Sequence, residues 1–489
     1  MTREGYENIR RYINLPCQRT LYDYTHVIDA KEGCQEEILE DILKKIKQSG
    51  NDEHYKFVNV MFDEMNIHSG LVVNRATGEL VGYANLFDVE VELGKLHSEI
   101  MKKEYCPSIA KKVLVYLAKG VTSEVHDVVA VYSTVDLTAS QLYARTWEVI
   151  YNLEEADIYV ISLTFDGAAV NRKFIKMHKT YRNSELLYAT TNYSAKEERP
   201  LFFILDPPHV LKTARNCFAN SYAHSKSRKL WKNNQTLSWE AIIQFYLATK
   251  SMKFKEHKLT EAHVKLTSFS RMKVLPAVQV FSASVASGLT RLKDHAILKD
   301  SPLDEVIKFI ALMNRFFDCL NGQEKDSTDG KKQIMKKDDH KAYRCKTDSR
   351  FKFLTDEFLQ FFRDWSRDVN KRRGFTLKEK ARMLISHQTL KALEITVFSF
   401  IGVVTFMLDK GAPMVNARVF NQDGLEQYFS ILRRKRGSDD HPTLKQVLDT
   451  RLSLHVQGSV SSASKSGNTE VQGGTGSTDF EPPLKRRKK

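Results

Sequence analysis

The sequence predicts an α/β protein in which a mixed sheet with helices on both faces is interrupted by a large, mainly α-helical insertion. Short apolar runs with the composition of strands dominate up to residue 208, and three of them end in an aspartate. From 209 to 415 the strand signal fades, and long segments with apolar residues at helical spacing replace it. A final amphipathic helix over 423–434 indicates that the sheet domain resumes after the insertion.

The first 50 residues are predicted to be helical. Apolar residues recur at helical spacing over 6–13, Leu15-Pro16 interrupts the pattern, and it resumes over 19–28. Two short helices around a tight turn, with arginines nearby, are typical of a helix-turn-helix that binds DNA, although an ordinary helical hairpin gives the same pattern. A third, amphipathic helix is predicted over 36–48. The region is therefore interpreted as a DNA-binding or dimerisation segment.

Five strands and one helix are predicted between 51 and 208. The first strand begins at 57 and ends at Asp63-Glu64, and the two apolar runs of 71–83 are expected to form its antiparallel partner. The other predicted elements are strands over 128–135, 158–165 and 201–205 and a helix over 140–152. This order is compatible with an RNase H-like sheet that carries helices on its faces.

The insertion is predicted to contain five helical segments, and the chain to end in a tail. The segments are 239–249, 277–292, 303–320, 351–369 and 377–408. The most apolar stretch, 395–408, is shorter than the roughly twenty residues that a bilayer requires, so a buried core helix is expected. A charged stretch over 323–349 is predicted to be a mobile loop. The Ser- and Gly-rich end, 458–489, is predicted to be disordered, and its basic cluster suits a nuclear import signal, a phosphate contact or a solvated chain end.

The composition narrows the class of partner. The formal charge is +15 and the pI about 9.3, and such an excess favours nucleic acid because basic side chains displace counterions from phosphates. The hydrophobic fraction of 42% is that of a globular protein. Six cysteines are scattered without a Cys-x-x-Cys pair, which argues against a zinc finger and a dense disulfide framework and fits a reducing compartment. The polar start of the chain predicts no signal peptide.

Of the three strand-end aspartates, Asp63 follows the first predicted strand and Asp166 the fourth. In an RNase H-like sheet these strands are neighbours, so the carboxylates should lie close together, where a cation has to offset their repulsion. Magnesium suits oxygen ligands and keeps positions open for phosphate oxygens. Glu426 on the last helix is the candidate third carboxylate, with Asp423 on the same face. Acidic residues also end strands for structural reasons, and the pattern alone leaves that alternative open.

Three ordered blocks carry a more specific signal. They are 206–212 (DPPHVLK), 272–282 and 421–430 (NQDGLEQYFS). The first looks like the DPPHLLK-type signature of P-element-like transposases, including their vertebrate THAP-domain relatives, and the other two are similar to further blocks of that family. The resemblance extends from about residue 5 to about 450.

The resemblance implies a catalytic set and a nucleotide site. Asp63, Asp166 and Glu426 match the family's catalytic acids, which bind Mg²⁺ (or Mn²⁺) for DNA strand cleavage and strand transfer. The family also binds GTP in its helical insertion, where the nucleotide organises the DNA complex, and no P-loop motif occurs in this sequence. The matching positions for GTP are Lys212, which faces the phosphates, Phe317, Asp318 and Asn321, which face the base, and Asp423.

Two further features of the sequence concern the residues after the fifth strand and the family's zinc finger. Asp206 and His209 are interpreted as structural or hinge residues, because Pro207-Pro208 stiffens the exit from the strand. The family's N-terminal THAP zinc finger has no counterpart in the sequence, which puts site-specific reading of DNA in doubt, because contacts to phosphates do not read sequence.

The leading hypothesis is a nuclear DNA transposase core of the DDE type. Its implied partners are transposon ends, target DNA, GTP and a second copy of the chain, with no membrane. The alternative is a transposase-derived, non-catalytic DNA- and GTP-binding regulator. A plain RNase H-like nuclease is a third possibility, which the blocks in the insertion disfavour.

Overall fold

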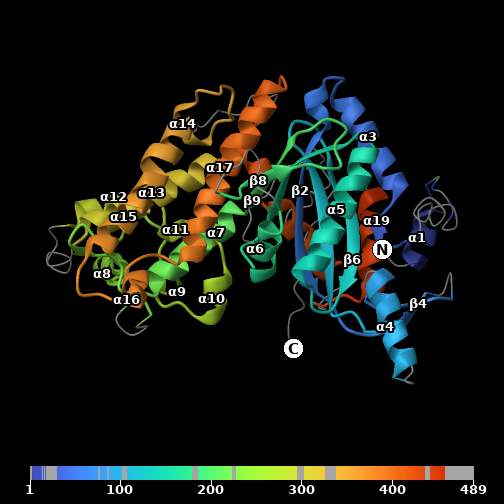
Figure 1. The fold of residues 1–489 in the computed structure, drawn as a ribbon, viewed down its shortest axis with the longest axis horizontal. Helices are drawn as coiled ribbons and strands as arrows, with labels where there is room; N and C mark the ends of the chain where they lie inside the picture. Colours follow the sequence, from blue (N-terminus) through green and yellow to red (C-terminus); the bar gives the residue numbers. More distant parts are fainter. Residues whose placement is uncertain are drawn as a thin grey trace.

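The molecule has two halves, one built on a sheet and the other on helices (Figure 1). A computed structural model gives the structure, and it describes most of the chain. The described residues are 3–10, 12–13, 15, 17, 30–74, 78–84, 88–101, 107–178, 186–222, 227–293, 302–324, 338–435 and 441–456.

The main sheet has seven strands among the described residues, in the order β1-β6-β5-β2-β7-β9-β8. The strands are β1 (Gly33–Cys34), β2 (Phe57–Asn66), β5 (Lys112–Gly120), β6 (His126–Thr134), β7 (Tyr159–Phe165), β8 (Ala189–Thr191) and β9 (Pro200–Leu205). β7 runs parallel to β2 on one side and to β9 on the other, whereas the remaining pairs are antiparallel. This mixed, RNase H-like sheet confirms the predicted fold class.

The predicted partner of the first strand is wrong. The antiparallel neighbour of β2 is β5, which pairs with it from Val58 to Asn66 and which the sequence pattern did not reveal. The apolar runs of 71–83 instead form a separate two-stranded sheet, β3 (Val72–Val73) and β4 (Leu80–Val81). The physical reason is burial. A central strand of this sheet is buried on both faces, and β5 can take that position because it is apolar along nearly its whole length, whereas β3 and β4 are partly or fully exposed.

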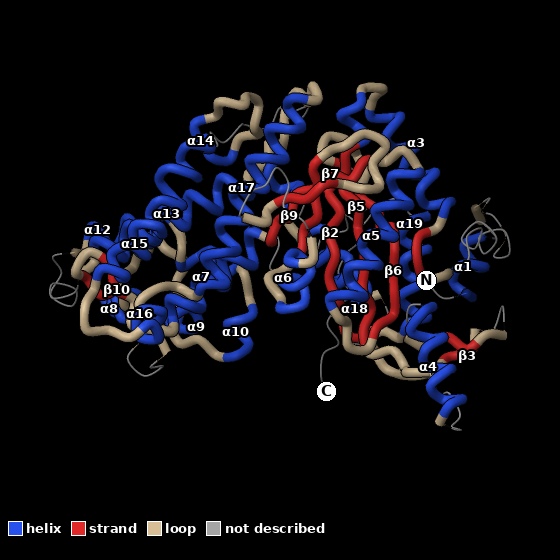
Figure 2. Tube along the Cα trace, viewed as in Figure 1, coloured by secondary structure: helices blue, strands red, loops and turns tan. Residues whose placement is uncertain are grey.

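Helices cover both faces of the sheet, as predicted (Figure 2). Along β2 the side chains alternate: Val58, Val60 and Phe62 enter one core, and Met61 and Met65 enter another. The first core is closed by α3 (Glu36–Ser49), α5 (Ala139–Glu155) and α6 (Ala169–Lys176). The second is closed by α18 (Asp423–Arg434) and α19 (Leu444–Val456). Because α18 packs directly on β2, the end of the chain returns to the sheet that its first third builds.

The insertion is helical, with one small hairpin of β10 (Trp231–Lys232) and β11 (Gln235–Thr236). Its helices are α7 (Pro207–Ala219), α8 (Glu240–Thr249), α9 (Glu261–Val264), α10 (Ser268–Met272), α11 (Leu275–Val280), α12 (Ala283–Arg291), α13 (Asp304–Asn321), α14 (Ser349–Lys352), α15 (Gln360–Lys371), α16 (Leu377–Arg382) and α17 (His387–Asp409). A π-helical segment, η4 (Phe353–Leu359), joins α14 to α15. The segment predicted as one helix over 377–408 is two, because Ser386 caps the start of α17.

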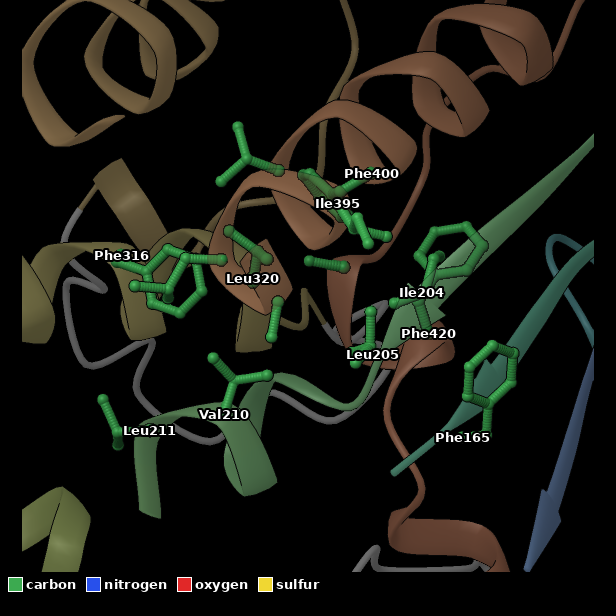
Figure 3. Packing of buried hydrophobic residues seen from close by; sticks show 14 of the residues in the cluster. Phe165, Ile204, Leu205, Val210, Leu211, Phe316, Leu320, Ile395, Phe400 and Phe420 are labelled. Atoms are coloured by element: carbon green, nitrogen blue, oxygen red, sulfur yellow. The ribbon is translucent and has the colours of Figure 1, made fainter. Parts of the chain in front are cut away.

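The long helix α17 joins the two halves. The hydroxyl of Thr396 donates to the carbonyl of Leu205 at 2.8 Å, and Ser399 donates to the carbonyl of Phe203 at 2.5 Å. Figure 3 shows Ile395 and Phe400 of α17 beside Ile204 and Leu205 of β9. By length and composition α17 could cross a membrane, but its packing on β9 agrees with the predicted core helix.

Several predictions concern the ends and the charged loop. The second helix of the predicted helix-turn-helix, 19–28, and the tail, 458–489, lie outside the described residues, although α1 (Arg3–Arg10) is described. The stretch 323–349 was expected to be a mobile loop, and its part 325–337 also lies outside them. The rest of it contradicts the expectation, because Tyr343 is fully buried and pairs with Val415 as an isolated bridge.

Candidate active site

Asp63 and Asp166 lie together at one edge of the sheet. In the parallel pairing of β2 and β7, Met61 is opposite Thr164, and continuing that register by two residues places Asp63 opposite Asp166. Burial and, to a smaller extent, the negative charge of Asp166 together raise the pKa of Asp63 to about 7, against a smaller lowering by the backbone N–H of Glu64. The sequence therefore predicted correctly that these two side chains lie close together, although β2 continues past Asp63 to Asn66.

Each of these carboxylates is held by only one oxygen. Asp63 Oδ1 accepts from the backbone N–H of Glu64 at 2.8 Å. Asp166 Oδ1 accepts from the side-chain amide of Asn171 at 2.7 Å and from the backbone N–H of Ala168 at 2.9 Å. The Oδ2 atoms make no hydrogen bond with any described residue. Two such oxygens on partly buried, mutually repelling carboxylates suit a hard divalent cation.

Glu426 stands apart from this pair. It lies in the first turn of α18, and its Oε1 is 3.9 Å from Nε2 of His209. Burial raises its pKa and nearby His209 partly offsets the effect, so that the pKa is about 7. Among the described residues, no group of three or more His, Cys, Asp or Glu side chains is close enough together to hold a metal ion. The structure thus brings two of the three predicted acids together and leaves the third beside a histidine.

Asp206 connects the start of α7 to the start of α18. Its carboxylate is buried, caps α7 by accepting from the backbone N–H of His209 at 2.9 Å, and lies 2.6 Å from Nδ1 of the same histidine. Its other oxygen accepts from the backbone N–H of Gln422 at 2.8 Å. Burial lowers the pKa of His209, but the hydrogen bond and charge of Asp206 outweigh this and raise it. These contacts agree with a structural role for Asp206, which in turn orients His209 toward Glu426.

A buried polar network fixes the segment that precedes α18, and the sequence reasoning missed it. Asn59 of β2 is fully buried; its amide donates to the carbonyl of Val419 at 3.1 Å and accepts from Ser162 and Thr164 of β7. The side-chain amide of Gln422 donates to the carbonyl of Phe62, next to Asp63, at 3.0 Å. The only sequence signal was the presence of polar residues inside apolar strand runs.

Lys212 lies one turn beyond His209 on α7. Burial lowers the pKa of its ammonium group, and the negative charges of Glu426, Asp206, Asp166 and Asp63 oppose that effect. It forms no ion pair within 4.0 Å with any described residue. A cation surrounded by carboxylates but paired with none is well placed to bind a phosphate group.

The other predicted nucleotide residues lie at the end of α13 and the start of α18. Asp318 Oδ2 accepts from the side-chain amide of Asn314 at 2.8 Å, and its Oδ1 lies 3.3 Å from Nε2 of His340. Both oxygens of Asp318 are therefore engaged within the chain. Phe317 is partly buried and packs on the core.

Asn321 and Asp423 are linked through Asn421. The side-chain amide of Asn421 donates to Asn321 Oδ1 at 2.8 Å and to Asp423 Oδ2 at 3.1 Å. The guanidinium of Arg418 binds the same oxygen of Asp423 at 2.8 Å. A cavity of about 560 Å³ lies nearby, and its lining includes Lys119, Gln323, Glu324 and Asn416. None of the five predicted nucleotide residues is among those that line this cavity.

The sheet order and the helical insertion define an RNase H-like protein with an insertion domain. Residues 30–179 match the family model described as TNP-like, RNase H N-terminal domain, and residues 208–333 match the one described as TNP-like, GTP-binding insertion domain. The chain therefore contains TNP-like RNase H and GTP-binding insertion domains and is homologous to P-element transposases.

Individual relatives agree with this assignment. The chain is 22% identical to the transposable element P transposase of Drosophila melanogaster over 444 residues, which is 88% of this chain and 48% of the relative. It is 19% identical to the human DNA transposase THAP9 over 319 residues, or 65% of this chain and 33% of that protein. It thus matches about half or less of the length of these relatives.

A solved structure shows the same fold. The Drosophila P element transposase strand transfer complex contains a chain that superposes with a TM-score of 0.69 at 20% identity, covering 94% of this chain and 89% of the other. The fold of the sheet domain and of its insertion is therefore shared.

Proposed function

We propose that the chain is a DNA transposase core that cleaves DNA strands and transfers their ends, using Asp63, Asp166 and Glu426. The observation that carries the proposal is the meeting of Asp63 and Asp166 on adjacent parallel strands, where burial and mutual repulsion raise the pKa of Asp63. Membership of a transposase family supports it.

The acid pair fits a divalent cation, Mg²⁺ or Mn²⁺. The residues that would hold it are Asp63 and Asp166, each through the carboxylate oxygen that makes no hydrogen bond to a described residue. A cation bound there would activate the attacking oxygen and stabilise the leaving oxygen of an in-line displacement. Glu426 is the proposed third ligand, and it has to turn away from His209 to join the pair.

The chain's own side chains supply positioning. Lys212 binds a phosphate beside the acids, because it is a partly buried cation without an ion-pair partner among the described residues. His209 is held by Asp206 and keeps Glu426 near the site until the third ligand is needed.

GTP is the proposed organising cofactor of the insertion. The match to a GTP-binding insertion domain supports this, as do the carboxylate and amide groups at the end of α13. Phe317, Asp318 and Asn321 would contact the base, and Lys212 and Asp423 the rest of the nucleotide. For guanine to bind Asp318, it has to displace Asn314 and His340 from the carboxylate oxygens of Asp318.

The second candidate function is a non-catalytic regulator that binds DNA and GTP. The observation in its favour is that Glu426 does not gather with the other two acids. Both proposed functions imply that the protein binds DNA, acts in the nucleus and assembles from at least two copies.

A strand-transfer assay separates the two functions. Purified protein is incubated with pre-cleaved transposon-end DNA, a plasmid target and Mg²⁺ or Mn²⁺, with and without GTP. Joined product should fall at least about a hundredfold in Asp63→Asn, Asp166→Asn and Glu426→Gln, since each removes a charge that acts in the transition state. Glu64→Gln is the matched control, because Glu64 neighbours Asp63 but is held by Thr134 and Lys112.

Each outcome decides between the functions. Product that depends on all three acids but not on Glu64 establishes the transposase core. Product that persists in Glu426→Gln removes that residue from the mechanism. DNA binding without any product supports the regulator.

A further inference from the structure

One stretch of the insertion, residues 363–382, is strongly basic. Residues 363–382 contain eight basic and three acidic side chains, so twenty residues carry a net +5 of the chain's +15. All of them are described, and they form most of α15, the following turn and α16. In Figure 1 these helices lie in the helical half, away from the sheet. The acids of the candidate active site do not contact them.

The packing of α15 sets the direction of its cations. Phe361, Phe362, Trp365 and Val369 are buried in the core of the insertion. Arg363, Arg367 and Lys371 follow one another at intervals of four residues, so they form a single exposed stripe along the helix. Successive charges in such a stripe are about 6 Å apart along the helix axis.

This stripe forms one wall of a groove. The opposite wall is the first two turns of α17, which contribute His387 and Lys391. The groove has a volume of about 740 Å³, and Phe362 and Leu390 are among the apolar residues of its lining. Cations from two helices therefore converge on a shared concave surface.

Most of this charge is not compensated within the chain. Arg363 and Lys371 form no hydrogen bond or ion pair with any described residue. Arg367 pairs with Asp364 at 2.9 Å and Lys391 lies 3.9 Å from Glu394, but both pairs are substantially exposed. Exposed pairs of this kind contribute little energy and exchange easily for another anion.

We propose that the groove between α15 and α17 binds the phosphate backbone of duplex DNA. The proposal rests on the proposed function, which makes DNA the partner, and adds a contact surface separate from the acids. Guanidinium groups present a planar fork of donors that fits phosphate oxygens, and a row of them along a helix can follow a strand. Contacts to phosphates position DNA without reading its sequence, so the groove holds DNA on the insertion irrespective of sequence.

The test measures DNA binding without catalysis. A fluorescein-labelled duplex of arbitrary sequence, about 30 base pairs long, is titrated with the full chain in EDTA at several NaCl concentrations, with anisotropy as the readout. The variant is Arg363→Glu combined with Lys371→Glu. The control is Lys255→Glu combined with Lys258→Glu, which makes the same change of charge at exposed positions of the same half.

The groove variant should bind at least about tenfold more weakly near 100 mM salt, and the slope of log K against log salt should be shallower by about 2. The control should change affinity less than about twofold. Equal losses in both variants would show a general effect of charge and overturn the proposal. Unchanged DNA affinity together with lost binding of a poly-glutamate peptide would also overturn it, because the occupant would then be an acidic protein segment.

Failure of this proposal is distinguishable from failure of the proposed function. Binding in EDTA does not depend on the acid pair, so Asp63→Asn should keep the parent affinity and salt slope. A protein that binds DNA through the groove but joins no ends retains this proposal and loses only the catalytic one.

Discussion

The two predicted carboxylate sites of this molecule contain the same residue type in opposite electrostatic settings. At the sheet edge, Asp63 has one hydrogen bond, faces Asp166, and has its pKa raised to about 7 by burial and by that neighbour. At the end of α13, Asp318 has Asn314 at one oxygen and His340 near the other.

The difference indicates what each site requires. The sheet edge carries negative charge that the chain does not neutralise, and an added cation would relieve it. The carboxylate of the insertion is already satisfied from within the chain, so a ligand there has to compete with existing contacts. The three predictions below, ordered from the largest expected effect to the smallest, test this comparison.

The largest effect is expected from the network that sets the distance between α18 and the acid pair. Asn59→Ala leaves the carbonyl of Val419 and the hydroxyls of Ser162 and Thr164 without their buried partner, which should cost about 2 kcal/mol of stability. Misplacement of Glu426 should also slow strand transfer by about tenfold to a hundredfold at saturating DNA. Urea denaturation and single-turnover joining measure the two effects.

The exposed asparagine of α15, Asn370, provides the control. Asn370→Ala should leave both stability and the joining rate near those of the parent. A normal joining rate in Asn59→Ala, despite the lost stability, would show that the network supports the fold and does not position Glu426.

A smaller effect is expected at the insertion. Asp318→Ala should weaken GTP binding about tenfold, because the lost hydrogen bonds to guanine are partly offset by the contacts that Asp318 no longer has to give up. Calorimetric titration with GTP measures this, and titration with Mn²⁺ should show no change at the acid pair. Equal GTP affinity in variant and parent would remove Asp318 from the nucleotide site.

The smallest effect is a dependence of stability on pH. The folded-state pKa values of Asp63 and Glu426 are raised to about 7 from 3.8 and 4.5, so ionisation costs the folded state more than the unfolded state. Stability should therefore fall as pH rises from about 4 to about 7. Asp63→Asn should remove part of that fall and raise the Tm at pH 8 by about 2–4 °C.

Measuring the Tm with and without a divalent cation tests the same site. Mg²⁺ at pH 8 should raise the Tm of the parent more than that of Asp63→Asn, since binding to the folded state stabilises it. An identical response of the two proteins to Mg²⁺ would place the ion elsewhere.

Part of the fold and of the site followed from local pattern. The apolar runs before Asp63 and Asp166 predicted correctly that the two aspartates lie on adjacent strands, because apolar runs are local properties of the chain. The predicted end of the first strand at Asp63-Glu64 was wrong, since β2 continues to Asn66 in its pairing with β5. The central strand β5 did not follow from the pattern, because a strand buried on both faces lacks the alternation that marks a strand.

The contacts across the chain were beyond local reasoning. Asn59 and Val419 are 360 residues apart, and their hydrogen bond exists only because α18 returns to β2. The same applies to Asp206, whose carboxylate meets the backbone of Gln422.

The sequence by itself determined the fold class, the helical insertion, the proximity of Asp63 to Asp166 and, through its signature blocks, the resemblance to P-element transposases. Apolar periodicity and strand ends are encoded within a few residues, and so they can be read directly from the chain. Only the tertiary structure decided that Glu426 faces His209, that Asp318 is engaged within the chain, and that cations of α15 and α17 share a groove. Each of these depends on how distant segments pack, which is set by the total burial and hydrogen bonding of the whole molecule.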